Sequence, residues 1–381
     1  MLPFRFKFIF VFSIFIYFFI LGINAECQTR TEFNLPDVLG YKVLKCDLHM
    51  HTMFSDGEVW PTLRAEEAWR QGLDAFAITD HIEDIYIDYI TPESRNLPYD
   101  LAKPYAEKLN VTIIKGGEIS KHYEPPGHLN AILVDDVDKL NHEYYKDAVK
   151  EANDQGGFVF WNHPGWKQHN YKSVWYKEQD TLYKNGWLHG IEVVNGIYYD
   201  PIAHQWCLDK GLTMMANTDA HSPTAYEYDM ANGEHRTMTF VLAKENSKEA
   251  IKDGLFNQRT ILYYQKILIG EEKYLLPLVQ NSLEFSSTEI TFEGRSSKYI
   301  FIKNNSSIDF DLEGAEMIDE LRFPYKLKLP AGKTTIMSLR PKAKGVNGSK
   351  NISIPYIVKN SLVAPGKELI YNINFNVTFT D

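Results

Sequence analysis

The chain has 381 residues, of which 44% are hydrophobic and 14% aromatic, and its formal net charge is −10. This length fits two domains with sizeable cores. The acidic balance argues against a surface that grips nucleic acid, but it does not exclude a small phosphate ester, because bound cations can supply positive charge locally.

Residues 1–25 differ from the rest of the chain. A short basic start precedes an apolar run over residues 8–22, and small residues follow up to Ala25. We expect a secretory signal peptide that is cut near Ala25, which would leave a secreted or periplasmic protein without a transmembrane span. The alternative is a membrane anchor retained through residues 8–22, although this run is shorter than the ~20 residues that a spanning helix needs. Residues 26–40 are expected to form a linker.

Short apolar runs and helix-like segments alternate over residues 41–265. Strands are expected at 43–46, 75–78, 111–114, 129–134, 158–161, 191–194, 212–215 and 238–242. Helices are expected between them at 62–71, 99–109, 143–155, 201–210 and 247–256. The alternation predicts an α/β domain with a parallel sheet, and seven or eight units favour a closed barrel over an open sheet.

The pattern changes over residues 266–381. Short segments of alternating hydrophobicity are separated by Asn, Ser, Gly and Pro, which predicts a small all-β sandwich. This part has no clustered His, Cys or acidic residues, so we expect it to pack on the barrel or to mediate association with a partner.

Side chains of the kinds that bind metals follow five of the expected barrel strands. His49 and His51 follow the first strand and, being two residues apart, share one face. The other four strands are followed by residues of the same types, namely Asp80 and His81, Glu118, His163, and Asp219 with His221. The carboxyl ends of parallel barrel strands meet at one rim, where active sites assemble.

This donor set has a definite chemical preference. Imidazole with carboxylate suits zinc, iron or manganese, and the absence of nearby thiolates argues against a structural zinc cage. Two such cations held ~3.5–4 Å apart can clamp the attacking and leaving oxygens of a phosphoryl transfer and supply the nucleophile from water. The sequence therefore predicts a metal-dependent site at this rim.

The same residues resemble the motifs of the polymerase and histidinol phosphatase (PHP) domain family. The motifs occur in order, as Asp-Leu-His-Met-His at 47–51 with Ser-Asp-Gly at 55–57, Thr-Asp-His at 79–81, Gly-Gly-Glu-Ile at 116–119, Gly-His-Leu-Asn at 127–130, His-Pro at 163–164 and Asp-Ala-His at 219–221. The resemblance covers roughly residues 41–265. It implies a distorted, TIM-like (β/α)7 barrel with two or three divalent ions of zinc, manganese or iron.

The resemblance also implies how the ligands divide among three metal positions. The first position would use His49, His51, Glu118 and Asp219, the second Glu118 as a bridge with His128 and His163, and the third Asp56, His81 and His221. His128 comes from the resemblance alone, because it opens a strand and does not end one. The catalytic residues would be Asp219, His81 and His221, and either histidine would act as the general acid if the third position is empty.

Further stretches resemble a secreted branch of the family that acts on organophosphate diesters. The expected function is hydrolysis of a small phosphodiester by a metal-bridging hydroxide. The alternatives are a phosphomonoesterase of the histidinol-phosphatase type, a nuclease and a non-catalytic binding protein. The residues expected to contact substrate are Glu192 and Asn195, which can instead hold metal ligands, together with Trp166 as a pocket wall and Arg236 as a phosphate clamp.

Overall fold

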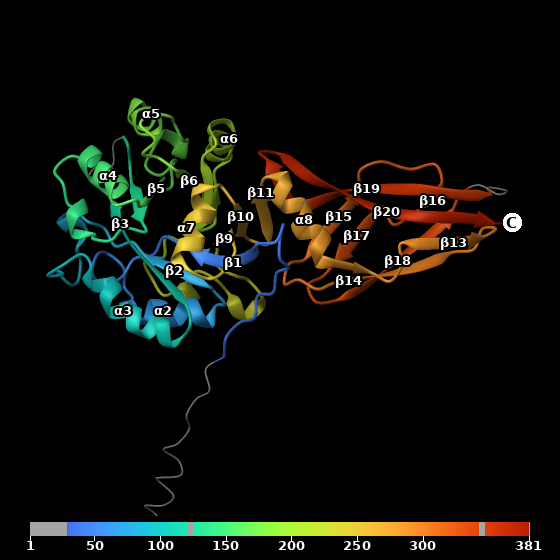
Figure 1. The fold of residues 1–381 in the computed structure, drawn as a ribbon, viewed down its shortest axis with the longest axis horizontal. Helices are drawn as coiled ribbons and strands as arrows, with labels where there is room; N and C mark the ends of the chain where they lie inside the picture. Colours follow the sequence, from blue (N-terminus) through green and yellow to red (C-terminus); the bar gives the residue numbers. More distant parts are fainter. Residues whose placement is uncertain (1–28, 121–124, 343–346, 381) are drawn as a thin grey trace, which may run out of the picture.

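The computed structural model describes residues 29–120, 125–342 and 347–380, which form two domains side by side (Figure 1). The expected signal peptide lies outside these residues, so export stays a prediction. No helix within the described ranges is long and apolar enough to cross a membrane. The end of the expected linker packs on the barrel, where Phe33 and Val38 are buried.

The first domain is a distorted barrel. Its strands are β1 (Lys42–Asp47), β2 (Ala75–Ile78), β3 (Thr112–Ile119), β4 (Leu129–Ile132), β5 (Phe158–Trp161), β6 (Gly190–Asn195), β8 (Thr213–Asn217) and β9 (Met238–Ala243). The two-residue strand β7 (Tyr198–Tyr199) forms a hairpin with β6. Threonine side chains join β8 to the strands that close the barrel. Ala216 N of β8 donates to Thr239 Oγ1 of β9 at 2.8 Å, and Thr260 Oγ1 of the next strand along the chain donates to Met214 O of β8 at 2.9 Å.

The expectation of an all-parallel sheet is wrong for two strands. β1, β2 and β3 are parallel neighbours, and so are β5, β6 and β8. β4 runs antiparallel to both β3 and β5, and β9 runs antiparallel to β1. A parallel crossover needs a dozen or more residues, whereas only residues 120–128 separate β3 from β4, so the chain turns back at the same rim.

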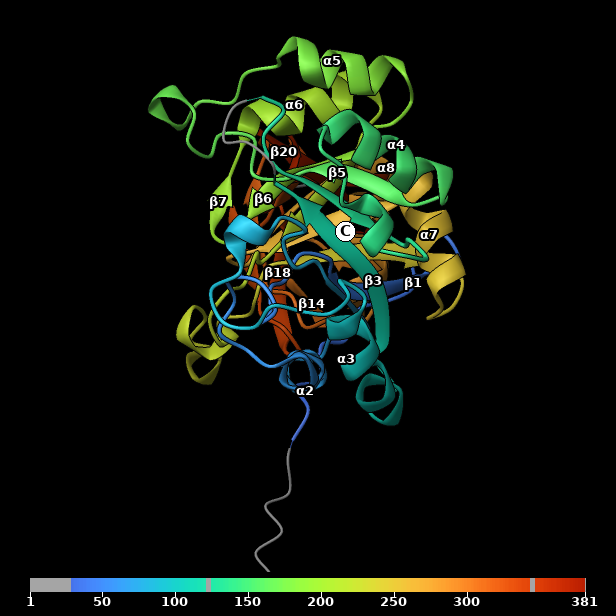
Figure 2. The same cartoon turned by 90° about the vertical axis from the view of Figure 1, so that its left-hand side faces the viewer.

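Helices cover the outside of the strands (Figure 2). They are α2 (Pro61–Arg70), α3 (Leu97–Lys108), α4 (Tyr145–Asp154), α5 (Lys177–Lys184), α6 (Pro201–Lys210) and α7 (Lys248–Phe256). Capping groups set the ends of α6, where Asp200 Oδ1 accepts from Ile202 N and Ala203 N and Gly211 closes the helix with a φ of +64°. The sequence did not predict α5, which buries only Gln179 and Leu182 and therefore lacks a long apolar stripe.

The second domain is an all-β sandwich. One sheet contains β12 (Leu283–Phe285), β14 (Lys298–Asn304), β18 (Thr334–Pro341) and β16 (Leu321–Arg322). The other contains β13 (Glu289–Glu293), β20 (Lys367–Thr380), β19 (Gly348–Ala364), β15 (Phe310–Gly314) and β17 (Lys326–Leu329). Buried and exposed residues alternate along these strands, as expected when one face of each sheet meets the core.

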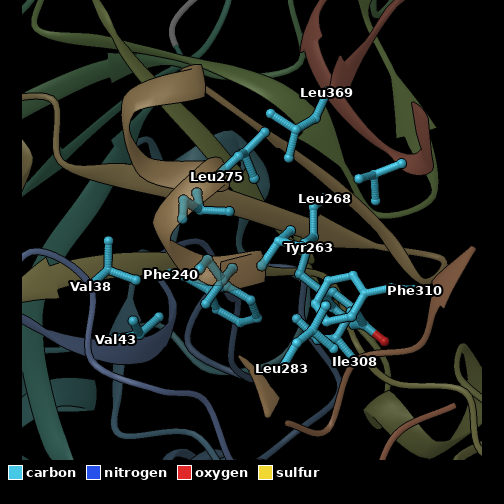
Figure 3. Packing of buried hydrophobic residues seen from close by; sticks show 14 of the residues in the cluster. Val38, Val43, Phe240, Tyr263, Leu268, Leu275, Leu283, Ile308, Phe310 and Leu369 are labelled. Carbon is cyan, nitrogen blue, oxygen red and sulfur yellow. The ribbon is translucent and has the colours of Figure 1, made fainter. Parts of the chain in front are cut away.

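The two domains are joined by both strands and side chains. After β10 (Thr260–Tyr264), β11 (Ile267–Gly270) pairs in parallel with β19 through Leu268 and Ser361, and α8 (Glu272–Ser282) leads into the sandwich. One hydrophobic cluster extends from Val43 and Phe240 in the barrel to Phe310 and Leu369 in the sandwich (Figure 3).

The β-domain lies at the amino-terminal end of β1. Just before β1, Asn34 O accepts from Ser307 N of the sandwich at 2.9 Å. β1 points away from this contact (Figure 1), so the residues that follow its carboxyl end lie on the far side of the barrel.

Candidate metal centre

The first pair of ligands lies where the segments after β1 and β8 run together. His51 N donates to Ala220 O and Asp219 N donates to His49 O, both at 3.0 Å. These backbone bonds hold the Asp219 segment against the two histidines, whose Nε2 atoms lie 3.2 Å apart and which are both fully buried. Asp219 Oδ1 lies 3.1 Å from each Nε2.

Glu118 lies at the centre of the cluster. It lies at the carboxyl end of β3 and is 1% exposed. Its backbone forms an isolated parallel β-bridge with that of His81, which follows β2. Five imidazoles lie within 3.5 Å of its carboxylate oxygens, namely those of His49 (3.5 Å), His51 (3.5 Å), His81 (2.9 Å), His128 (3.2 Å) and His163 (3.5 Å). One carboxylate thus joins ligands from four different strands.

Asp56 is surrounded by a second set of imidazoles. Its oxygens lie 3.3 Å from His81 Nε2, 3.3 Å from His221 Nε2 and 3.6 Å from His51 Nδ1. His51 therefore faces Asp219 with one ring nitrogen and Asp56 with the other. This sharing differs from the division implied by the resemblance, in which His51 serves the first position alone.

The donor set fits divalent cations. Three groups of residues could each hold a cation, because the ligand atoms within each group lie within 4.8 Å of one another. The groups are His49–His51–Asp219, His81–Glu118–His128 and His51–Asp56–His81–His221. Ligand bonds of about 2.1 Å place neighbouring ligand atoms about 3.0 Å apart in an octahedron and 3.4 Å apart in a tetrahedron, close to the separations seen here. Asp219 Oδ1 is also buried without a hydrogen-bond partner. All nine predicted ligands lie in this cluster.

Charge governs protonation in the cluster. Burial alone would raise the pKa of Glu118. The surrounding imidazoles have a larger, opposite effect, so its pKa lies well below the usual range. Burial lowers the pKa of His81, yet Glu118 and Asp56 raise it to about 10. Burial and the charge of His221 lower the pKa of His51 to about 3. The carboxylates are therefore ionised, as metal ligands must be.

Glu192 is buried behind the ligand histidines and forms hydrogen bonds to them. It is 1% exposed, and its Oε1 lies 2.8 Å from His49 Nδ1 and accepts from Asn217 Nδ2 at 2.9 Å. Its Oε2 accepts from His163 N and from Asn195 Nδ2, both at 3.0 Å. Asn195 Nδ2 also donates to Asp219 Oδ2 at 3.2 Å. These hydrogen bonds fit the second of the two roles expected for Glu192 and Asn195, the orientation of metal ligands, and both roles stay predictions.

Arg236 is buried, and its guanidinium is bonded to other side chains of the protein. It is fully buried, its guanidinium forms an ion pair with Asp47, and Nη1 donates to Gln71 Oε1 at 2.7 Å. The expected phosphate clamp is therefore wrong, because a carboxylate buried beneath the centre requires this cation. Asp47 in turn accepts from Thr218 Oγ1 at 2.6 Å, next to the ligand Asp219.

Trp166 lies beside the ligands His128 and His163, and its expected role as a pocket wall stays a prediction. It is 38% exposed, and its ring centroid lies 4.9 Å from that of His128 and 5.1 Å from that of His163. It lines a small cleft with seven other residues, namely Gly127, His128, Trp161, Asn162, His163, Pro164 and Gln168. The cleft opens beside the ligands His128 and His163.

Several supporting roles were not predicted from the sequence. Asn162 Nδ2 donates to Glu118 Oε1 and Ser120 Oγ bonds His81 Nδ1, both at 2.6 Å. Asp80 accepts from Ser55 Oγ at 2.8 Å and from Thr52 Oγ1 at 2.6 Å, which fixes the loop that carries Asp56. The adjacency of Asn162 to His163 and of Asp80 to His81 was the available signal, but neither residue has a distinctive spacing of its own.

Two family models match the chain. The PHP domain matches residues 47–275, which is more than half of the chain, and an Ig-like domain matches residues 283–374. The chain belongs to the PHP domain family. The predicted PHP barrel followed by an all-β domain is thereby confirmed.

Solved structures extend this comparison to both domains. A two-domain protein from Bacteroides vulgatus, described as containing a predicted PHP-like metal-dependent phosphoesterase, is 41% identical to this PHP protein. The match covers 91% of this chain and 99% of that chain, with a TM-score of 0.83. An amidohydrolase from Chromobacterium violaceum is 15% identical over 47% of this chain and 88% of that chain, with a TM-score of 0.35. No curated protein sequence matches the chain.

Proposed function

We propose that this PHP protein is a metal-dependent phosphoesterase that hydrolyses a small-molecule phosphodiester. The observation that carries the proposal is Glu118, a buried carboxylate with five imidazoles within 3.5 Å of it at one rim of the barrel. The Bacteroides vulgatus relative, described as a metal-dependent phosphoesterase, supports the same reaction class. Two or three divalent cations of zinc, manganese or iron would supply a nucleophile from water and neutralise developing charge on the phosphate.

The residues of the chain would bind the cations and donate a proton to the leaving group. His49, His51 and Asp219 would hold a cation, and Glu192 would orient His49 toward it. His221 is the most exposed of the ligand histidines, with 38% of its side chain accessible, and burial is outweighed by Asp56 and Asp219 so that its pKa rises to about 9. We infer that His221 donates a proton to the leaving oxygen when no cation occupies the Asp56 group.

The surroundings favour a diester over a monoester. A monoester dianion generally needs additional protein cations, and the two arginines buried near the centre are already engaged, Arg236 by Asp47 and Arg64 by backbone carbonyls and Glu67. Trp166 offers an apolar wall beside His128 and His163, where the second ester group can lie. Both features suit a monoanionic substrate with two ester groups.

The substrate preference can be tested with a matched pair of chromogenic esters. Initial rates are measured on bis-p-nitrophenyl phosphate and p-nitrophenyl phosphate after the protein has been loaded with Mn²⁺ or Zn²⁺. We expect kcat/KM for the diester to exceed that for the monoester by at least about tenfold, since a difference of that size needs only ~1.4 kcal/mol of transition-state binding. The reverse order would favour the phosphomonoesterase alternative.

Three variants separate catalysis from substrate binding. Glu118→Gln and His163→Ala should each lower kcat by at least roughly a hundredfold, because each removes a cation ligand. Trp166→Ala should mainly raise KM for the diester, because it removes a contact made before the reaction. Tyr299→Ala is the control, since Tyr299 is an exposed aromatic residue on β14 of the other domain. Full activity in Glu118→Gln would contradict the proposal.

A further inference from the structure

Arg64 is a fully buried arginine on α2 whose five N–H donors all have acceptors. Nε donates to His51 O at 2.9 Å, and Nη2 donates to Ala220 O and His221 O, both at 2.8 Å. Nη1 donates to Ser222 O at 3.0 Å and to Glu67 Oε2 at 2.8 Å. Four of the five acceptors are therefore backbone carbonyls in the two segments that carry metal ligands.

We propose that Arg64 is a positioning residue that joins these segments and thereby sets the affinity of the centre for cations. The segments come from distant parts of the chain, after β1 and after β8, and each carries side chains that face a shared cation position. Arg64 bonds to the backbone of His51 and of His221 directly. A shift of either segment would change the separation between His51 Nε2 and Asp219 Oδ1, which is now 3.1 Å.

The guanidinium geometry is what this position requires. Ala220 O already accepts from His51 N, and His221 O already accepts from Glu58 N at 2.8 Å, so Arg64 supplies the second bond to each carbonyl. Lysine has three donors on one atom and cannot reach five acceptors arranged around a planar fork. Glu67 completes the arrangement, because its Oε1 also accepts from Thr224 N at 2.9 Å and so keeps the carboxylate beside Nη1.

The contacts of Arg64 predict which cation positions depend on it. They involve the backbone around His51, Asp219 and His221, which serves the His49–His51–Asp219 and His51–Asp56–His81–His221 groups. The His81–Glu118–His128 group is held mainly by β2, β3 and β4, because β3 pairs with both of the other strands. We therefore expect an unequal effect on the bound cations.

The test is the binding of Mn²⁺ to the full chain after removal of metal by a chelator, measured by titration calorimetry. Arg64→Lys should weaken the binding of the affected equivalents by roughly tenfold to a hundredfold, as expected for loss of a group that orients ligands, and should leave at least one equivalent unchanged. Arg259→Lys is the matched control, because Arg259 also bonds one carbonyl, Leu242 O at 3.2 Å, and pairs with Asp253, but it has no contact with a ligand segment. Its Mn²⁺ affinities should equal those of the wild type.

The inference is overturned if Arg64→Lys folds and binds every equivalent of Mn²⁺ as the wild type does, or if Arg259→Lys weakens binding by the same factor. If Arg64→Lys does not fold, Glu67→Gln takes its place, because it leaves the guanidinium present but removes its charged partner. Glu67→Gln should weaken the same equivalents by a smaller factor, and unchanged affinity would overturn the inference. The inference rests on the cation centre of the proposed function but not on its substrate, so this titration can fail while the diester preference holds.

Discussion

At the scale of single residues, the centre depends as much on the groups behind the ligands as on the ligands. His49 shows this most clearly. Burial lowers its pKa, but the charges of Asp219 and Glu192 raise it well above the usual value. Glu192 therefore makes this imidazole a stronger electron donor toward a cation while fixing its ring through Nδ1.

Replacing Glu192 with glutamine tests that role. The amide keeps the size of the side chain but removes the charge beside His49 Nδ1, so we expect the affinity for Mn²⁺ to fall roughly tenfold to a hundredfold. The measurement is calorimetric titration of the metal-free chain, with circular dichroism to show that the fold is retained. An unchanged affinity would mean that Glu192 acts only in packing.

The sequence predicts the metal ligands better than it predicts the buried residues that position them. His49, His51 and Asp219 could be predicted because they follow apolar strands, and strand ends meet at a rim. Arg64 and Arg236 have no such periodic signal. A buried guanidinium needs several carbonyls or a buried carboxylate that can accept its hydrogen bonds, and those acceptors are brought to one place only after distant segments have come together.

At the scale of elements, the direction of β4 explains the residue that strand periodicity did not predict. His128 precedes β4, so in a parallel barrel it would lie at the rim opposite Glu118. Because β4 is antiparallel to β3, its beginning lies beside the end of β3, and His128 Nδ1 comes within 3.2 Å of Glu118. An apolar run has the same pattern in either direction, so the short connection over residues 120–128 was the only local signal.

The close pairing of β3 and β4 depends on Gly116. A Cβ at this position would lie 2.8 Å from both Ala131 O and Ile132 Cγ2 on β4. Gly116→Ala should therefore push β4 outward, lower the free energy of unfolding by about 1–3 kcal/mol, and weaken Mn²⁺ binding through His128. Urea denaturation and metal titration measure the two effects.

Gly270→Ala is the control for this substitution. Gly270 also lies in a strand, β11, but a Cβ there would meet Ile261 at an ordinary contact distance of 3.4 Å. We expect little change in stability and none in Mn²⁺ affinity. Equal losses in both variants would show that the effect comes from strand propensity and not from the β3–β4 contact.

At the scale of the whole molecule, the two domains share one hydrophobic cluster and a pair of hydrogen-bonded strands. The sequence predicted the change of texture near residue 265, but it could not show that Leu268 of β11 pairs with Ser361 of β19. That pairing joins residues 93 positions apart, and only the folded sandwich brings them together.

The shared cluster predicts cooperative unfolding. Because Tyr263, Leu268 and Phe310 pack in the same cluster, loss of either domain exposes apolar surface on the other (Figure 3). We expect one transition in scanning calorimetry, and we expect Phe310→Ala to lower the free energy of unfolding of the whole chain by about 3–5 kcal/mol. Two separate transitions, of which Phe310→Ala moves only one, would contradict this expectation.

Acid stability is a further property of the whole molecule, and it depends in part on His204. This residue of α6 is fully buried, its Nδ1 lies 2.9 Å from Tyr199 OH, and burial lowers its pKa to about 4. The unfolded chain, with a pKa near 6.5, therefore binds a proton before the folded chain does. The stability that comes from keeping His204 neutral is complete above pH 6.5 and is lost as the pH falls toward 4.

Between pH 7 and pH 5 this linkage costs the folded chain about 2 kcal/mol for one such histidine. His204→Gln keeps an acceptor for Tyr199 but removes the titration, so the variant should lose about that much less stability over the same interval. His189 and His235, whose pKa values burial also lowers to about 4, remain in the variant, so the pH dependence should shrink and not vanish. Urea denaturation of both proteins at pH 7 and pH 5 gives the comparison, and equal losses would show that His204 is not the group that titrates.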